Sequence, residues 1–316
     1  MLTCTLNREN MESLSAVMRE KNELSLFNRF ASKECSEDEK LKLNQIGFVD
    51  EEGNLLDKVR PTINILSNPY AVIKMCFTGG ASVFEHSINY DNTFNNHVSL
   101  TVTPQDFCID DASNPISIIK ILKDFVGVSN LKSINISGKF NIYEAFVIAS
   151  VLDIERRSAL RAFIDEMPVT HTSYNVNMIW RITNSTSSSI QWFVSIINDI
   201  VGSRETLSLQ QIQTGVDGLV EKGILVKIGE QYQLTGEIAK LSGRMIIIDN
   251  ILSSHISKFD DENNIVCTGF TCIQSGVHDL LFVDYDGKDI VLETITSVGL
   301  LDGLEQFLKG RTFFSF

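Results

Sequence analysis

The stretch from 219 to 234, LVEKGILVKIGEQYQL, gives the clearest indication of local fold in this chain. An apolar-periodic helix runs to about Lys222, and Gly223 ends it because glycine readily adopts the left-handed conformation of a helix C-terminus. Apolar residues then alternate on both sides of Gly229, which is typical of a short β-hairpin. The stretch therefore predicts a helix followed by a hairpin, as in a winged helix.

An earlier stretch, from 43 to 56, has the same pattern. It reads LNQIGFVDEEGNLL, and its Gly47 and Gly53 align without a gap with the two glycines of the later stretch. Each stretch is followed by a helical segment, a series of β-rich segments and a closing helix. The order of elements occurs twice with little residue identity, so we expect a duplicated unit with pseudo-two-fold symmetry.

Segments rich in β-branched and aromatic residues are the expected strands. They are 70–77, 82–88, 98–102 and 107–110 in the first half, and 245–249, 265–273, 279–283 and 289–295 in the second. The turn residues between them favour two antiparallel meanders that join in a central sheet. A further connection, 131–136, also has strand character.

Segments with apolar residues at helical spacing are the expected helices. They are 9–32, 36–46, 59–66, 115–126, 141–166, 176–182, 188–201, 207–222, 235–241 and 297–308. Thr206 or Ser208 is the expected cap of the helix that runs to Lys222. With the strands they predict an α+β fold, a central antiparallel sheet with winged-helix-like helical parts. We place the first helix-hairpin-meander-helix unit in 1–130, and the long linking helix with the second unit in 131–316.

Composition and charge restrict the class of protein. The net charge of −13 disfavours binding to polyanions such as nucleic acid. No run of about eighteen apolar residues and no apolar signal-peptide core is present, so we expect a cytoplasmic protein that does not enter a membrane. The six cysteines have no CxxC spacing and mostly apolar neighbours, which predicts buried free thiols in a reducing compartment.

Sequence motifs for catalysis, cofactors or metals are absent. The five histidines form no HxxxH or HExxH pattern, and the chain has no P-loop, no G-x-G-x-x-G and no G-x-S-x-G. Gly79-Gly80 lies between two expected strands and favours a turn over a phosphate-binding loop. We therefore predict no catalytic, cofactor-binding or metal-binding residues and no enzymatic activity. An enzyme whose site is assembled from distant residues stays an open alternative.

Three arginines, at 156, 157 and 161, cluster on the long expected helix. The simpler interpretation is a surface set that pairs with Asp153, Glu155 and Asp165, and the alternative is an anion site. The two tryptophans, Trp180 and Trp192, are expected to pack between helices.

The winged-helix pattern raises the alternative of a DNA-binding transcriptional regulator. The expected recognition helix, 207–222, contains two acidic residues and one lysine, and the hairpin after it contains only Lys227 and Glu230. The first copy is acidic at 37–39 and at 50–52. Because phosphate binding requires several cations, we interpret both units as structural or protein-binding and nucleic acid as an improbable partner.

The stretch 43–56, continued by ILSNPYAVIK at 65–74, resembles the N-terminal pattern of the EspG family of type VII secretion chaperones. In that pattern L-x-x-x-G, an apolar residue, Val, a second Gly and Leu precede an L-x-x-P connection to the first strand. The resemblance implies a pseudo-two-fold fold with a central antiparallel sheet. It also implies a cytoplasmic protein without catalytic residues that binds secreted substrates. The Asn- and Ile-rich composition of this chain departs from typical members.

The predicted function is therefore non-enzymatic, chaperone-like binding of a protein partner, with a secretion substrate of a type VII-like system as the specific hypothesis. The loops 78–82 and 89–96 and helices of the second half are the expected contact regions. The candidate partner-binding residues are Thr78, Gly79, Gly80, Tyr90 and Phe94. The oligomeric state is left open by the sequence.

Overall fold

The computed structural model describes residues 2–18, 20–31, 35–79, 82–168, 172–185, 189–202, 206–276 and 278–308. The candidate residue Gly80 lies outside these ranges. The chain divides into two compact units. Unit 1 comprises Met1–Ile121, Ser253–Gly269 and Leu304–Phe316, and unit 2 comprises Leu122–Leu252 and Phe270–Gly303. The predicted boundary near residue 130 and the duplication of whole halves stay predictions.

The described strands hydrogen-bond in the order β1-β5-β4-β3-β2-β9-β10-β11-β12-β6. Pairings such as β2 with β3 and β11 with β12 are antiparallel. Their bounds are β1 Thr3–Asn7, β2 Ala71–Gly79, β3 Ser82–Tyr90, β4 His97–Val102, β5 Asp106–Asp110, β6 Ser137–Asn141, β9 Asn250–Phe259, β10 Ile265–Ser275, β11 Asp279–Tyr285 and β12 Asp289–Ile295. A large antiparallel sheet with helices confirms the predicted α+β class.

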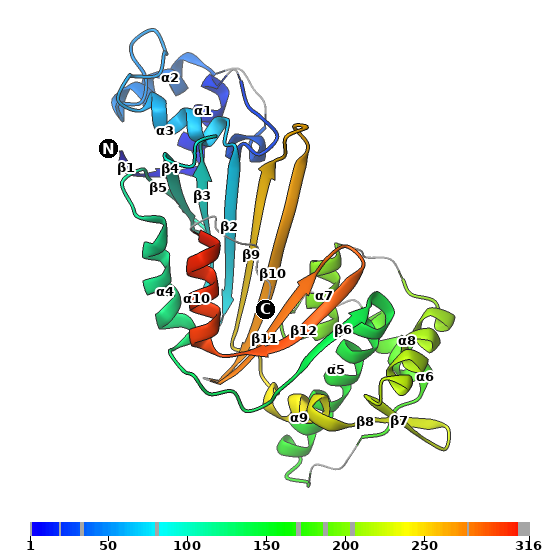
Figure 1. Cartoon of the computed structure of the whole chain (residues 1–316). Helices are drawn as coiled ribbons and strands as arrows, with labels where there is room; N and C mark the ends of the chain where they lie inside the picture. The colour runs from blue at the N-terminus through cyan, green and yellow to red at the C-terminus, as the bar shows by residue number, and fades with distance from the viewer. Residues whose placement is uncertain are drawn as a thin grey trace. The chain divides into compact units, whose positions relative to one another are not determined.

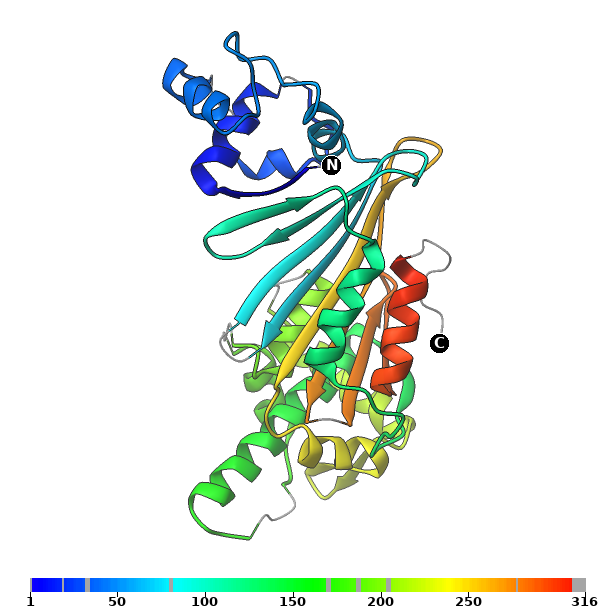
Figure 2. The same cartoon turned by 90° about the vertical axis from the view of Figure 1, so that its left-hand side faces the viewer.

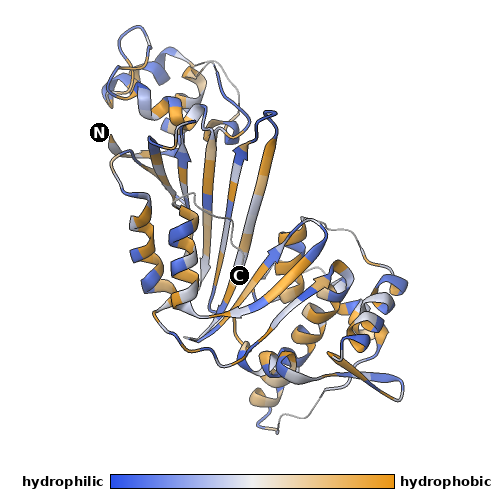
Figure 3. Ribbon diagram, viewed as in Figure 1, coloured by the Kyte–Doolittle hydropathy of each residue, from blue (hydrophilic) through white to orange (hydrophobic). Residues whose placement is uncertain are grey.

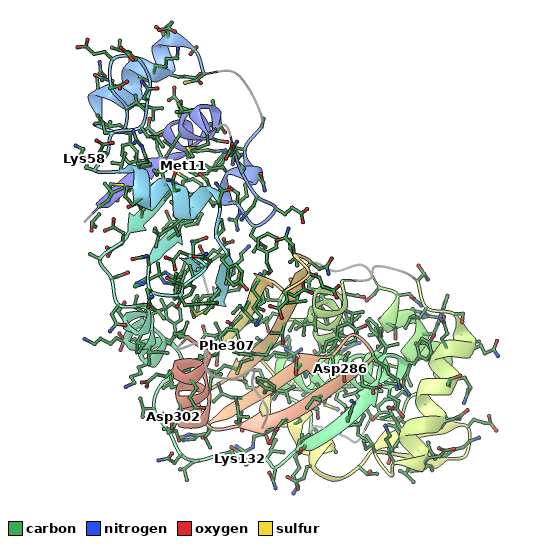
Figure 4. The ribbon with its side chains drawn as sticks, turned by 45° about the horizontal axis from the view of Figure 1, so that its top comes forward. Met11, Lys58, Lys132, Asp286, Asp302 and Phe307 are labelled. Atoms are coloured by element: carbon green, nitrogen blue, oxygen red, sulfur yellow. The ribbon has the colours of Figure 1, made fainter. Side chains whose placement is uncertain are left out.

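In unit 1, α1 (Arg8–Val17), α2 (Glu37–Gln45) and α3 (Arg60–Ser67) lie together at one end of the strands β2, β3 and β4 (Figures 1 and 2). They enclose an apolar cluster with the short helix η1 (Leu26–Arg29) and with β4. Met11 lies inside this cluster, whereas Lys58 lies at its exposed side (Figure 4).

Two further helices, η2 (Pro115–Ser117) and α4 (Ile118–Val126), follow β5 in the chain. The last described element is α10 (Ser297–Leu308). Strand β2 buries alternate residues, from Ala71 through Ile73, Met75 and Phe77, because successive side chains of a strand point to opposite faces. That face of β2 therefore belongs to the core.

Unit 2 is organised around the helix α5 (Ile142–Ile164). The helices that contact it are α6 (Val176–Thr183), α7 (Phe193–Val201), α8 (Leu209–Glu221) and α9 (Gly236–Arg244). Figure 3 shows apolar residues along α5 and the helices beside it. Asn141 starts α5 through a capping box, in which Asn141 accepts from the Glu144 backbone and the Glu144 side chain accepts from the Asn141 backbone. This confirms the predicted long helix.

Both helix–hairpin stretches form as predicted. Helix α8 ends at Gly223, whose φ is +69°, and the hairpin of β7 (Leu225–Ile228) and β8 (Gln231–Leu234) follows. In the earlier stretch α2 ends at Gly47, with φ +77°, and an isolated bridge joins Val49 to Leu55. The interpretation of these parts as winged helices stays a prediction.

The strand predicted at 245–249 is wrong, and β9 at Asn250–Phe259 was missed. Met245 and Ile248 are buried in the same apolar cluster as residues of α5, and the Arg156 guanidinium donates to the carbonyls of Met245 and Ile246. The apolar run is therefore a core segment whose carbonyls bind a side chain. Strand β9 buries only alternate residues, and one of them is Ser254, which weakens its apolar pattern.

Other boundaries also differ from the predictions. In the described part of 9–32, where one helix was expected, the structure has the shorter helix α1 and the short helix η1, and β1 precedes them unpredicted. The strand expected at 131–136 begins later, as β6. Among the cysteines only Cys272 is buried, and Cys267 is exposed, so the expectation of mostly buried thiols is wrong.

The arginine cluster on α5 is only partly a surface set. Arg156 is buried and its guanidinium lies 3.1 Å from the buried carboxylate of Asp153, which accepts hydrogen bonds from the Phe193 and Val194 amides. Its surface assignment is therefore wrong. Arg161 pairs at 3.5 Å with Asp165 on the exposed helix end, as predicted.

Candidate functional site

The candidate partner-binding residues lie at opposite ends of the β2–β3 hairpin. Thr78 pairs with Val83 near the hairpin turn, whereas Tyr90 pairs with Ala71 at the other end. Seven residue steps of a strand separate the two ends by roughly 23 Å. The structure therefore does not bring Thr78 and Gly79 together with Tyr90 and Phe94.

The loop from 91 to 96 is ordered by the carboxylate of Asp91. Asp91 accepts hydrogen bonds from the Thr93 backbone amide at 3.1 Å and from the Asn96 side chain at 2.6 Å. Burial opposes ionisation of Asp91, but the bonds from Asn96 and Thr93 outweigh it and lower the pKa of this carboxyl. The ionised Asp91 therefore holds the loop at neutral pH.

Phe94 occupies the tip of this loop in an unusual conformation. Its φ is +57°, which is uncommon for an aromatic residue, and its side chain is 43% exposed. A large apolar side chain held in a left-handed, half-exposed position suggests a functional requirement for the ring.

Phe94 belongs to an aromatic cluster. Its ring lies 5.7 Å from Tyr70 in an edge-to-face arrangement and 5.4 Å from Tyr90. Tyr90 is buried and donates its hydroxyl proton to the carbonyl of Leu308 at 3.2 Å. Burial raises the pKa of Tyr90 to about 12, so the hydroxyl keeps its proton at neutral pH. The Tyr90 ring is thus fixed, and Phe94 is the most exposed of the three rings.

A cavity of about 560 Å³ opens beside this cluster within unit 1. Its apolar lining includes Ile73, Tyr90, Phe94, Ile256 and Leu308. Polar groups at its edge include His97, which donates from Nε2 to the Ser113 carbonyl at 2.6 Å. Such a lining, mostly apolar with a few polar groups, suits an apolar or aromatic side chain or a small ligand.

Sequence reasoning missed several residues of this cavity. Ile256 lies on the strand β9, which was not predicted, and Leu308 lies at the end of α10. Both positions are distant from Tyr90 in the chain. Ile256 comes to the cavity because β9 lies next to β2 in the sheet, and the Leu308 carbonyl accepts a hydrogen bond from the Tyr90 hydroxyl. Of the five candidate residues named from the sequence, Tyr90 and Phe94, from the loop 89–96, are the two that line the cavity.

The described residues of the two candidate recognition helices carry no basic strip. Helix α8 contains no Lys or Arg, and Lys222 just after it binds the buried carboxylate of Glu144 at 2.6 Å. On α2 the two lysines pair with Glu37 and Glu9. Nothing in these helices favours binding to DNA phosphates.

Within the described ranges, no group of three or more His, Cys, Asp or Glu residues could hold a metal ion. In the same part of the chain, no helix is both long and apolar enough to span a membrane.

Comparison with known proteins shows a likeness of fold. No family model and no curated protein matches the chain. The solved structure of the Mycobacterium tuberculosis type VII secretion system chaperone EspG5 in complex with the PE25–PPE41 dimer matches with a TM-score of 0.53 and 10% sequence identity. The match covers 100% of this chain and 99% of that chain. At this identity the likeness establishes a distant relationship of fold, as the sequence resemblance implied.

Proposed function

We propose that this chain is a cytoplasmic, non-enzymatic chaperone-like protein that binds a secretion substrate of a type VII-like system. The observation that carries the proposal is the fold likeness over the full length of both chains to a chaperone solved with a protein dimer. The acidic charge and the absence of catalytic sequence motifs support a protein partner over nucleic acid or a chemical substrate.

The aromatic cluster provides the contact region that we propose. Phe94 is exposed beside a cavity with apolar walls, and aromatic residues near pockets are typical anchors of protein interfaces. An apolar side chain of the partner would pack against Phe94 and enter the cavity. The hairpin end with Thr78 and Gly79 is the second proposed contact, and Gly80, which follows them in the sequence, belongs to the same proposal. Because it lies about 23 Å away, it would bind a separate part of the partner.

Substitution of Phe94 by Asn tests this assignment without endangering the fold. Asn tolerates positive φ better than Phe, so Phe94→Asn keeps the loop and removes the ring. We expect partner binding to weaken roughly ten- to thirty-fold, as for an interface anchor, with an unchanged melting temperature. Ile46→Asn is the matched control, because Ile46 is equally exposed at 43% but lies outside the cavity.

The measurement is affinity capture of the tagged full chain from its native host, with mass spectrometry of the retained proteins. Recovery of one secreted protein by the wild type and by Ile46→Asn, but not by Phe94→Asn, supports both function and site. Equal recovery by all three would reject the site but keep the function. Co-purification of nucleic acid or a small molecule without a specific protein would reject the function.

A further inference from the structure

Helix α5 has two parts that differ in burial. From Glu144 to Arg156 most of its residues are buried in unit 2, whereas none of the described residues from 157 to 168 is buried. In Figure 2 this end of the helix, in green, projects from the other helices of unit 2. About two turns of helix therefore extend into solvent.

The projecting end is nevertheless apolar on one side. Leu160, Phe163, Ile164 and Met167 are 37%, 82%, 76% and 65% exposed. The spacing of Leu160, Phe163 and Ile164 places these three along one stripe of the helix, and Met167 follows just after the helix end. Exposed apolar patches of this kind mark interaction surfaces, and no described element of unit 2 covers this stripe.

The end of the helix is well formed despite its exposure. The Met167 amide donates to the Ala162 carbonyl and the Glu166 amide to the Phe163 carbonyl, which is the Schellman arrangement. Glu166 takes the left-handed position with φ +54°. The stripe is therefore presented on a defined helix end that a partner can bind.

We propose that the projecting end of α5 binds the same end of a second copy of this chain, as an antiparallel pair related by a two-fold axis. The proposal goes beyond the chaperone-like function and does not depend on it. A two-fold pair is self-complementary, since each surface patch meets its own copy. The apolar stripe of one copy would pack on the stripe of the other.

The charged residues beside the stripe favour a second copy over an unrelated partner. Arg161 and Asp165 lie one turn apart on one flank of the stripe, paired at 3.5 Å, with side chains 85% and 53% exposed. When two helices pack antiparallel about a two-fold axis, a given flank of the stripe faces the same flank on the second copy. The two helices run in opposite directions, so residue positions along the flank are matched in reverse order. Arg161 of one copy then faces Asp165 of the other, twice per dimer.

The available area predicts a weak dimer. An aromatic side chain buries about 150–250 Å² when fully covered and an aliphatic one less, so these four partly exposed side chains contribute on the order of 400 Å² per copy. A stable interface buries roughly 800 Å² per partner. We therefore expect a reversible dimer with a Kd of roughly 10–100 µM.

The first test is sedimentation velocity of the full chain over a range of concentrations around that Kd. We expect a shift from monomer to dimer in the wild type, and monomer throughout in the double variant Phe163→Glu with Ile164→Glu. Val83→Glu is the control, because Val83 is exposed at 61% on β3, and it should dimerise like the wild type. A monomeric wild type, or a dimer that survives the double variant, would overturn the proposal.

The second test uses the charges. Arg161→Asp leaves two carboxylates on the flank and Asp165→Arg leaves two cations, so each variant alone should dimerise at least about five-fold more weakly. Mixed in equal amounts at low salt, the two variants should form a heterodimer that is as strong as the wild-type dimer or stronger. A mixture that associates no better than either variant alone would show that these flanks do not face each other and would refute the antiparallel arrangement.

Discussion

The two helix–hairpin segments, 43–56 and 219–234, end their helices identically but support their hairpins differently. In the first, the Gly47 amide donates to Asn44 and the Phe48 amide to Leu43. In the second, the corresponding amides of Gly223 and Ile224 donate to Val220 and Leu219. Both are Schellman motifs at aligned positions, so the same local signal gives the same helix end.

The hairpins after these motifs diverge. In the first, Asp50 accepts from the amides of Glu52 and Asn54, and the described ladder is the single bridge from Val49 to Leu55. In the second, β7 and β8 form a four-pair ladder, and Tyr174 adds a bridge to Tyr232. The first hairpin relies on a side chain of its own turn, and the second on a neighbouring segment.

The helices differ in the same way. Leu43 is the buried residue of α2, whereas α8 buries Ile212, Gly215, Val216 and Leu219. A Cβ at Gly215 would lie 2.6 Å from the Tyr143 carbonyl oxygen, so the helices α8 and α5 approach closely there. The comparison shows that glycines specify the chain reversal locally, and that tertiary packing decides how strongly each segment is held.

The largest effect should come from Gly215→Ala on α8, the helix that leads into the second hairpin. This change disturbs the close packing of α8 against Tyr143 of α5. The added methyl group meets backbone that cannot move aside, so we expect a loss of about 2–3 kcal/mol in the free energy of unfolding. Urea denaturation followed by circular dichroism measures it. Gly243→Ala on α9 is the control, because nothing lies within 4 Å of its Cβ, and it should be neutral or stabilising. Equal results for both variants would mean that α8 is not close-packed at Gly215.

An intermediate effect is expected from Gly47→Ala and Gly223→Ala, which test the shared helix end. Each glycine has positive φ, and alanine there should cost about 1–2 kcal/mol because of its Cβ. The space around each Cβ is open or bordered only by the flexible end of Lys58. Denaturant titration should therefore give similar losses, with smaller losses for the Asn variants. A large loss for one glycine and none for the other would show that the two motifs are not equivalent.

The smallest effect is a pH dependence that only the first segment should have. Hydrogen bonds from the Asn54 backbone lower the pKa of Asp50 below its usual value of 3.8. The folded-state pKa is depressed, so the stabilisation is present above pH 3.8 and is lost as pH falls through the folded value. Amide exchange at Gly53 and Asn54, after correction for the intrinsic rate, should show weaker protection below this range.

Asp50→Asn should remove that pH dependence, and the hairpin of β7 and β8, where Val226 takes the aligned position, should never show it. Parallel loss of protection in both hairpins on acidification would indicate general acid unfolding and not the titration of Asp50.

Much of the secondary structure was predictable because its signals are local. Capping residues such as Ser36, Ser208 and Asn141 start α2, α8 and α5, and glycines end the helices of both segments. The strand β9 and the buried Arg156 were not predictable. Serines at 253, 254 and 257 interrupt the apolar pattern of β9. An arginine becomes a core residue only where groups such as Asp153 and the carbonyls of Gln191, Met245 and Ile246 surround it.

The candidate site was predictable to a smaller extent. Tyr90 and Phe94 were identified from their loop, but Thr78 and Gly79 lie at the far end of the same hairpin. The register of β2 and β3 imposes that separation. Ile256 and Leu308 join Tyr90 at the cavity because β9 and α10 are brought beside it from distant parts of the chain.

The sequence by itself determined where helices end and chains reverse, because a glycine at positive φ or a capping side chain acts within a few residues. It also determined the α+β class through its alternating and helical periods. Only the tertiary structure decided which hairpin pairs with a neighbouring segment, which arginine is buried and which aromatic rings line a cavity. Those outcomes depend on contacts between residues far apart in the chain, and a local pattern carries no information about its distant partner.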